Sequence, residues 1–123
     1  MLNKKFYIKI KNQVYRRTLV VKALDKNFVS EEFDIEDINI CNRKMALTID
    51  CSLSSSHLEK IEEIISESSK KSLVFCLNIY DGNKMIDNCE ISNIDFVFTV
   101  FNSILIRKTN HTYFTERILK YEN

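Results

Sequence analysis

The feature that most constrains the fold is a succession of short segments with the periodicity of β-strands. Alternation of apolar and polar residues over about four to eight positions is typical of a half-buried strand, because successive side chains point to opposite faces of a sheet. Asp81-Gly82 contains the only glycine of the chain and predicts a tight hairpin between two such segments. Strand-like alternation, or an apolar run of similar length, occupies residues 6–11, 14–23, 33–40, 45–51, 73–80, 85–91, 96–101 and 104–108.

One segment has the period of a helix instead. Ser56 and Glu59 match a capping box, the pattern with which many helices begin. The apolar residues that follow are three or four positions apart: Leu58, Ile61, Ile64 and Ile65. We therefore expect one helix at about 56–69. Separately, the irregular alternation at 33–40 predicts a β-bulge at Glu36-Asp37 in that strand.

Many strands and a single helix predict an α+β fold that is mainly β. The expected architecture is an antiparallel β-sandwich or small barrel of about eight strands with one flanking helix. The 123 residues are about the size of one ordinary domain, so we expect a single domain over 1–123.

The strand expected at 96–101 is apolar on both faces. Phe96 and Phe98 share one face, and Phe101 lies on the other. A strand of this kind must be covered on both sides. Either the sheet closes into a barrel, or another copy or a partner buries one face. Phe96, Phe98 and Phe101 are therefore candidate interface residues.

Charge is unevenly distributed along the chain, although the net charge is only +1. Residues 1–22 carry seven Lys and Arg and no acid, whereas residues 23–69 carry eleven acids and four bases. The two segments either lie side by side within one fold, or the basic segment of one copy meets the acidic segment of another. The second alternative gives further interface candidates: Arg16, Arg17, Glu31, Glu32 and Asp34.

The basic segment also has aromatic residues between its lysines and arginines. Tyr7, Lys9, Lys11 and Tyr15 would lie on the first pair of strands, at about residues 6–23. Basic residues interleaved with aromatic rings on a sheet hold phosphates and stack on bases. These four residues are therefore candidates for contact with nucleic acid.

No motif indicates catalysis or metal binding. Cys51 and His57 are close in sequence, but Cys51 falls on an apolar strand face and His57 at a helix N-terminus, which disfavours its charged form. The other histidine, His111, falls in an expected turn. One glycine and no proline leave few residues for the unusual loop backbones of active sites. We expect no enzyme, cofactor, metal or small-molecule substrate.

The sequence contains neither a membrane-spanning apolar run nor the apolar core of a signal peptide. We therefore expect no membrane partner and a location in the cytoplasm or in a virion.

The order of the expected elements resembles a family. Two N-terminal strands, a strand at 45–51 that leads into the Ser-capped helix, the strand at 73–80 and the Asp81-Gly82 hairpin follow one another as in tail-tube proteins of contractile phages and type VI secretion tube proteins. The resemblance implies a small β-barrel-like sandwich that stacks as rings. The expected function is a non-enzymatic virion component of tail, tube or baseplate type, with head-to-tail contacts in a homo-oligomer or larger assembly. The alternative is a small binding module: an inhibitor, an adaptor or a nucleic-acid-binding protein.

Overall fold

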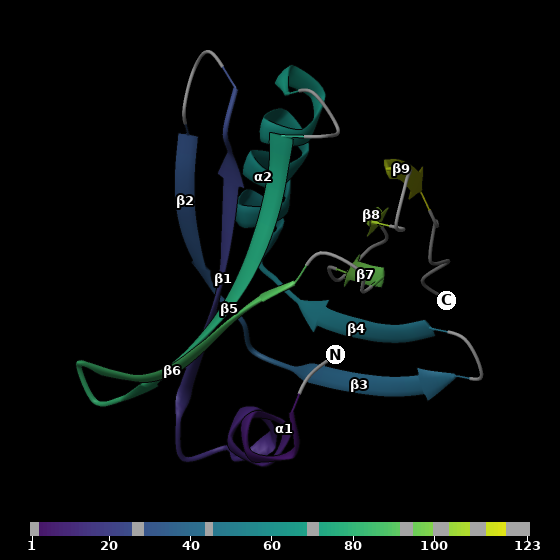
Figure 1. The fold of residues 1–123 in the computed structure, drawn as a ribbon. Coiled ribbons are helices and arrows are strands. Elements are labelled where there is room, and N and C mark those ends of the chain that lie inside the picture. Colours follow the sequence, from purple (N-terminus) through teal and green to yellow (C-terminus); the bar gives the residue numbers. More distant parts are fainter. Residues whose placement is uncertain are drawn as a thin grey trace, which may run out of the picture.

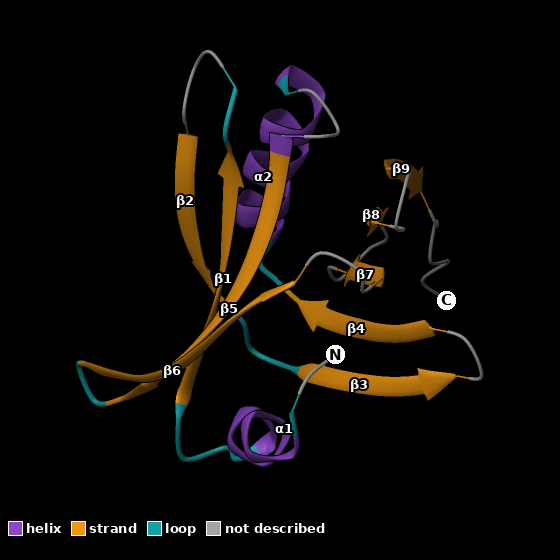
Figure 2. Cartoon of the chain, viewed as in Figure 1, coloured by secondary structure: helices purple, strands orange, loops and turns teal. Residues whose placement is uncertain are grey.

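The computed structural model describes residues 3–25, 29–43, 46–68, 72–91, 95–99, 104–108 and 113–117. Two helices and nine strands lie in these residues (Figures 1 and 2). The elements, in chain order, are α1 (Lys4–Lys11), β1 (Arg16–Ala23), β2 (Val29–Asp34), β3 (Ile38–Arg43), β4 (Ala46–Ser52), α2 (Ser55–Glu67), β5 (Leu73–Asp81), β6 (Lys84–Ile91), β7 (Asp95–Thr99), β8 (Ile104–Lys108) and β9 (Tyr113–Arg117).

The strands form two sheets, which confirms the mainly β, α+β class. The first sheet has the order β2-β1-β5-β6 and is antiparallel throughout. The second has the order β3-β4-β7-β8-β9. Its β4–β7 pair is parallel and departs from the antiparallel pairing expected from the sequence. A parallel pair needs a long connection between its strands, and here α2, β5 and β6 provide it.

The first element is a helix, so the strand predicted at 6–11 is wrong. Asn3 caps α1 by accepting a hydrogen bond from the backbone N–H of Phe6 at 2.8 Å. Phe6 and Ile10 are one helical turn apart and both are buried. The same two residues also fit an alternating strand, because a spacing of four is a multiple of two. Ile8 distinguishes the two periods, since it points to solvent.

The second helix confirms the predicted helical segment, with a different N-terminus. Ser54, rather than Ser56, is the cap, and its hydroxyl accepts from the backbone N–H of His57 at 3.3 Å. The predicted capping box is therefore wrong by two residues. The apolar stripe is as expected, and its buried members are Leu58, Ile61 and Ile64.

The strand predicted at 33–40 is divided between the two sheets. β2 ends at Asp34, and β3 begins at Ile38. Between them the chain is held by backbone hydrogen bonds, from Ile35 N–H to the carbonyl of Arg17 and from Glu36 N–H to that of Ser52. The predicted bulge at Glu36-Asp37 is therefore the point where the chain leaves one sheet for the other (Figure 2).

The hairpin predicted at Asp81-Gly82 is confirmed. Asp81 pairs with Lys84, and Gly82 has a φ of 63°, which a residue with a side chain rarely adopts. The register shifts by one residue between Ile79 and Tyr80, as in a β-bulge.

One buried cluster joins both helices and both sheets. Leu58, Ile61 and Ile64 of α2 cover the inner face of the first sheet, while α1 lies beside β3 and β6 at the other end (Figure 1). No helix among the described residues lies on the opposite face of the first sheet (Figure 1). The largest fully buried side chains are Phe6, Phe75, Phe98, Ile10, Leu19, Ile49, Leu58, Ile61, Leu77, Ile79 and Ile91.

Candidate functional site

The candidate site is the uncovered face of the four-stranded sheet, which we call the outer face. Its members follow from the strand registers, because cross-strand partners point to the same side of a sheet. Val20 of β1, for example, is paired with Glu32 on one side and Cys76 on the other, and Cys76 is paired with Glu90. The outer face consists of Arg16, Thr18, Val20, Lys22, Ser30, Glu32, Asp34, Val74, Cys76, Asn78, Tyr80, Met85, Asn88 and Glu90.

The carboxylate of Glu32 is the centre of a polar cluster on this face. Its Oε2 accepts hydrogen bonds from the Thr18 hydroxyl, from the Tyr80 hydroxyl at 2.6 Å and from the Asn78 amide at 3.4 Å. Thr18 and Asn78 are buried although they point away from the core. Since buried polar groups are costly without partners, Glu32 is what allows them to lie here.

Arg16 connects Tyr80 of this cluster to Asp34 on the edge strand β2. Its guanidinium forms an ion pair with Asp34 at 2.8 Å and lies 4.4 Å above the centre of the Tyr80 ring. Arg16, Glu32 and Asp34 therefore meet within one chain. Of the two arrangements that the charge distribution allowed, the structure shows the intrachain one for Arg16 and Asp34.

The Glu32 cluster predicts a dependence of stability on pH. Partial burial raises the pKa of the Glu32 carboxyl, but the hydrogen bonds from Thr18, Tyr80 and Asn78 and the charge of Arg16 outweigh burial, so the pKa is lowered. A lowered pKa gives stability that is complete above the unfolded-state value of about 4.3 and is lost as the pH falls through the folded-state value. In denaturant titrations, the stability difference between wild type and Glu32→Gln is expected to shrink below about pH 4.

The matched control for this experiment is Glu67→Gln, at an exposed position on α2. Its difference from wild type is expected to be within about 0.5 kcal/mol at each pH. A difference for Glu32→Gln that stays constant from pH 7 to pH 3 would show that the carboxylate is not the charged acceptor described here.

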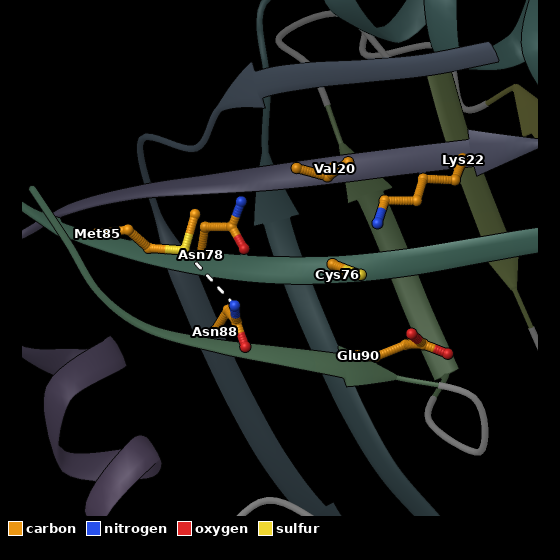
Figure 3. A pocket seen from close by; sticks show the side chains of 7 residues that line it. All are labelled: Val20, Lys22, Cys76, Asn78, Met85, Asn88 and Glu90. Carbon is orange, nitrogen blue, oxygen red and sulfur yellow. Dashed lines mark hydrogen bonds between the residues drawn. The ribbon is translucent and has the colours of Figure 1, made fainter.

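A hollow of about 280 Å³ lies beside the Glu32 cluster (Figure 3). Short side chains, Val20 and Cys76, form its floor, and longer ones surround them. Lys22 and Glu90 lie toward one end and Met85 toward the other. Among the described residues, neither Lys22 nor Glu90 forms an ion pair. The hollow is lined by Val20, Lys22, Cys76, Asn78, Met85, Asn88 and Glu90.

Three of the predicted interface residues are not on the outer face. Arg17 is only 6% exposed, and it donates hydrogen bonds to the carbonyls of Ile10 and Glu36 at 3.0 and 3.2 Å. Phe98 is 0% exposed and packs against Phe75, with ring centres 5.8 Å apart. Arg17 and Phe98 are therefore internal residues, and the prediction that they face a partner is wrong for both. Glu31 is paired with the core residue Val21 and is partly buried.

The remaining interface candidates, Phe101 and the side chain of Phe96, lie outside the part of the chain that the structure describes. His111 also lies outside it.

The predicted nucleic-acid residues do not form the expected strand pair. Tyr7, Lys9 and Lys11 lie on α1, whereas Tyr15 lies beyond it and packs partly against the core. Lys9 forms an ion pair with Asp87 at 3.0 Å. Lys11 and Tyr7 are exposed, whereas Lys9 and Tyr15 are partly buried.

The Cys51–His57 pair has no nucleophilic character. Burial and the nearby charge of Asp50 raise the pKa of the Cys51 thiol, although the charge of Arg17 partly opposes this shift. A thiol with a raised pKa stays protonated, and the thiolate is the reactive form. His57 packs on the ring of Phe33 at 5.4 Å, and its Nδ1 has no hydrogen-bond partner.

Sequence reasoning missed several members of the outer face, namely Thr18, Val20, Cys76, Asn78 and Tyr80. One signal was available. In the segment 73–80, Asn78 and Tyr80 share the parity of Cys76, so the polar residues of this strand fall on one face.

Comparison of the chain with family models, with curated proteins and with solved structures finds no match in any of the three. The described residues include no group of three or more side chains able to hold a metal ion. No helix in the described part of the chain is long and apolar enough to cross a membrane.

Proposed function

We propose that this chain is a non-enzymatic assembly protein whose copies associate head-to-tail through the outer face of the four-stranded sheet. The observation that carries the proposal is the composition of that face. On its two central strands, Val20, Val74 and Cys76 form a small apolar patch, and polar or charged side chains surround that patch. Protein interfaces share this organisation of an apolar centre with a polar margin.

The polar margin is ordered before any partner arrives. Arg16 is held by Asp34 and Tyr80, and Tyr80 is held by Glu32. Side chains that are already fixed lose less conformational entropy on binding. Tyr and Arg are also the residues that most often dominate binding energy at protein interfaces. These properties suit recognition of a protein surface.

The setting that we propose is a phage virion, in a tail, tube or baseplate-type component. The support is the order of elements from β4 through α2 and β5 to the β5–β6 hairpin, which resembles tube proteins. The first element contributes nothing to this resemblance, because it is a helix.

The proposal predicts self-association that one exposed substitution on the outer face abolishes. Met85 is an exposed apolar residue at the end of the hollow, so Met85→Glu places a charge there without changing the core. Light scattering after size exclusion is expected to give a mass above 14.5 kDa for wild type and 14.5 kDa for Met85→Glu.

The matched control is Val14→Glu, which adds the same charge at an exposed apolar residue in the turn between α1 and β1. It is expected to keep the mass of wild type. A wild-type chain that stays at 14.5 kDa at every concentration would contradict the proposal.

A second candidate function, nucleic-acid binding, is favoured by the exposed lysines of α1. Lys4, Lys5 and Lys11 are exposed, and Tyr7 is partly accessible beside them. This alternative predicts an affinity for single-stranded DNA that falls steeply with salt. Substitution Lys11→Glu would then lower DNA affinity and leave the mass in solution unchanged.

A further inference from the structure

We infer that the hollow of the outer face is filled by α1 of a second copy of this chain, with Ile8 entering the hollow and Lys4 reaching Glu90. This inference rests on the proposed self-association and names the two surfaces that meet. The argument comes from the exposed side of α1, the size of the hollow, the placement of the two surfaces and their charges.

The exposed side of α1 carries an apolar residue between charged ones. Ile8 is 59% exposed, and Lys4 and Lys11 lie one turn before and one turn after it on the same side of the helix. The helix is anchored from its other side, where Phe6 and Ile10 enter the core. It therefore presents Ile8 on a rigid support, with little entropy left to lose on docking.

The hollow has the size and lining to receive one such side chain. The volume of the hollow is about 280 Å³. This is slightly less than the roughly 300 to 1,000 Å³ of pockets that hold drug-sized ligands, so the hollow has room for one side chain rather than for a longer segment. Val20 and Cys76 offer an apolar floor, and Met85 adds an adaptable apolar wall.

The helix of one chain does not reach its own hollow, because the two lie on opposite sides of the first sheet. Lys9 of α1 pairs with Asp87, which is the register partner of the buried residue Ile79 on the inner face. The hollow is lined from the outer face. The contact is therefore between copies, and it joins two different surfaces, as a head-to-tail contact requires.

Charge determines which wall of the hollow the lysines approach. Glu90 has no ion pair in the described chain and attracts Lys4 of the second copy. Lys22, also without an ion pair, repels it. Lys22→Glu is therefore expected to strengthen self-association several-fold at low salt, since it replaces the repelling wall by an attracting one.

The inference predicts that Ile8→Glu weakens self-association by at least about tenfold, because a carboxylate loses the apolar contact with Val20 and Cys76 on the floor of the hollow. Val14→Glu is the matched control, since Val14 is an exposed apolar residue just beyond α1. The control is expected to associate as wild type does. Thermal unfolding of both variants checks that the fold is intact.

Charge reversal provides the second test. Lys4→Glu and Glu90→Lys are each expected to weaken association, and the double variant is expected to recover most of it. Both residues are exposed, so neither change disturbs the core. Recovery supports the Lys4–Glu90 contact, whereas equal losses in the single and double variants overturn it.

The outcomes separate this inference from the proposed function. If Met85→Glu gives monomers while Ile8→Glu and the Lys4 reversal associate like wild type, the outer face is an interface but α1 is not its occupant, and the inference fails alone. If wild type does not self-associate, both fail. Loss of association in Ile8→Glu, intact association in Val14→Glu and recovery in the double reversal support both.

Discussion

Replacement of Phe98 by alanine is expected to lower the free energy of unfolding by about 3–5 kcal/mol. Phe98 is fully buried and packs against Phe75, so the change removes a large apolar side chain and leaves a cavity between β7 and the first sheet. A loss of this size is a large part of the stability of an ordinary domain. Urea titration monitored by circular dichroism measures it.

Val14→Ala is the control, because it removes apolar atoms from an exposed side chain. Its expected effect is within about 0.5 kcal/mol. The same experiment separates the two roles considered for Phe98. A variant that keeps its stability but loses self-association would identify Phe98 as an interface residue and contradict its place in the core.

The second large effect is expected at Arg17, which is a buried charged residue with 6% of its surface exposed. Its guanidinium joins the last turn of α1, through the Ile10 carbonyl, to the connection between β2 and β3, through the Glu36 carbonyl. Arg17→Met is expected to cost about 2–3 kcal/mol, because it leaves a buried carbonyl without its charged donor. Hydrogen exchange should become faster first in α1.

Arg16→Met is the matched control, since Arg16 is exposed and its ion pair with Asp34 lies at the surface. Exposed ion pairs contribute about 0.2–1 kcal/mol, so the loss should be smaller. Equal losses for the two variants, or unchanged exchange in α1 after Arg17→Met, would show that Arg17 does not hold the helix.

The strands were predicted correctly where the strand pattern and the turn residue point to the same structure. The apolar run at 73–80 and the strand-like segment at 85–91, together with a glycine at a position that needs positive φ, define the β5–β6 hairpin without any distant contact. The same is true of the buried stripe of α2, because Leu58, Ile61 and Ile64 recur every three residues along one side of the helix.

The first helix could not be recognised from alternation alone. Phe6 and Ile10 satisfy both the strand and the helix period, and Ile8 is apolar in sequence although it is exposed in the structure. The helix was signalled only by Asn3, a good N-cap residue. Tertiary packing of Phe6 and Ile10 into the core decides between the two periods.

The outer face was only partly predictable, because its register joins strands far apart in sequence. Glu32 and Asp34 were recognised as acidic and Arg16 as basic, but nothing local places Asn78 and Tyr80 beside Glu32. The β1–β2 and β1–β5 pairings do so. The β1–β2 pairing also brings Arg16 of the basic segment to Asp34 of the acidic segment within one chain.

The most direct test of head-to-tail association is the mass of a mixture of two variants by light scattering. Ile8→Glu disables α1 but keeps the hollow, and Met85→Glu disables the hollow but keeps α1. Each alone is expected to be monomeric at 14.5 kDa, while an equimolar mixture should give a species of twice that mass. A mixture that remains monomeric, from variants that each abolish the self-association of wild type, would contradict a contact between these two surfaces.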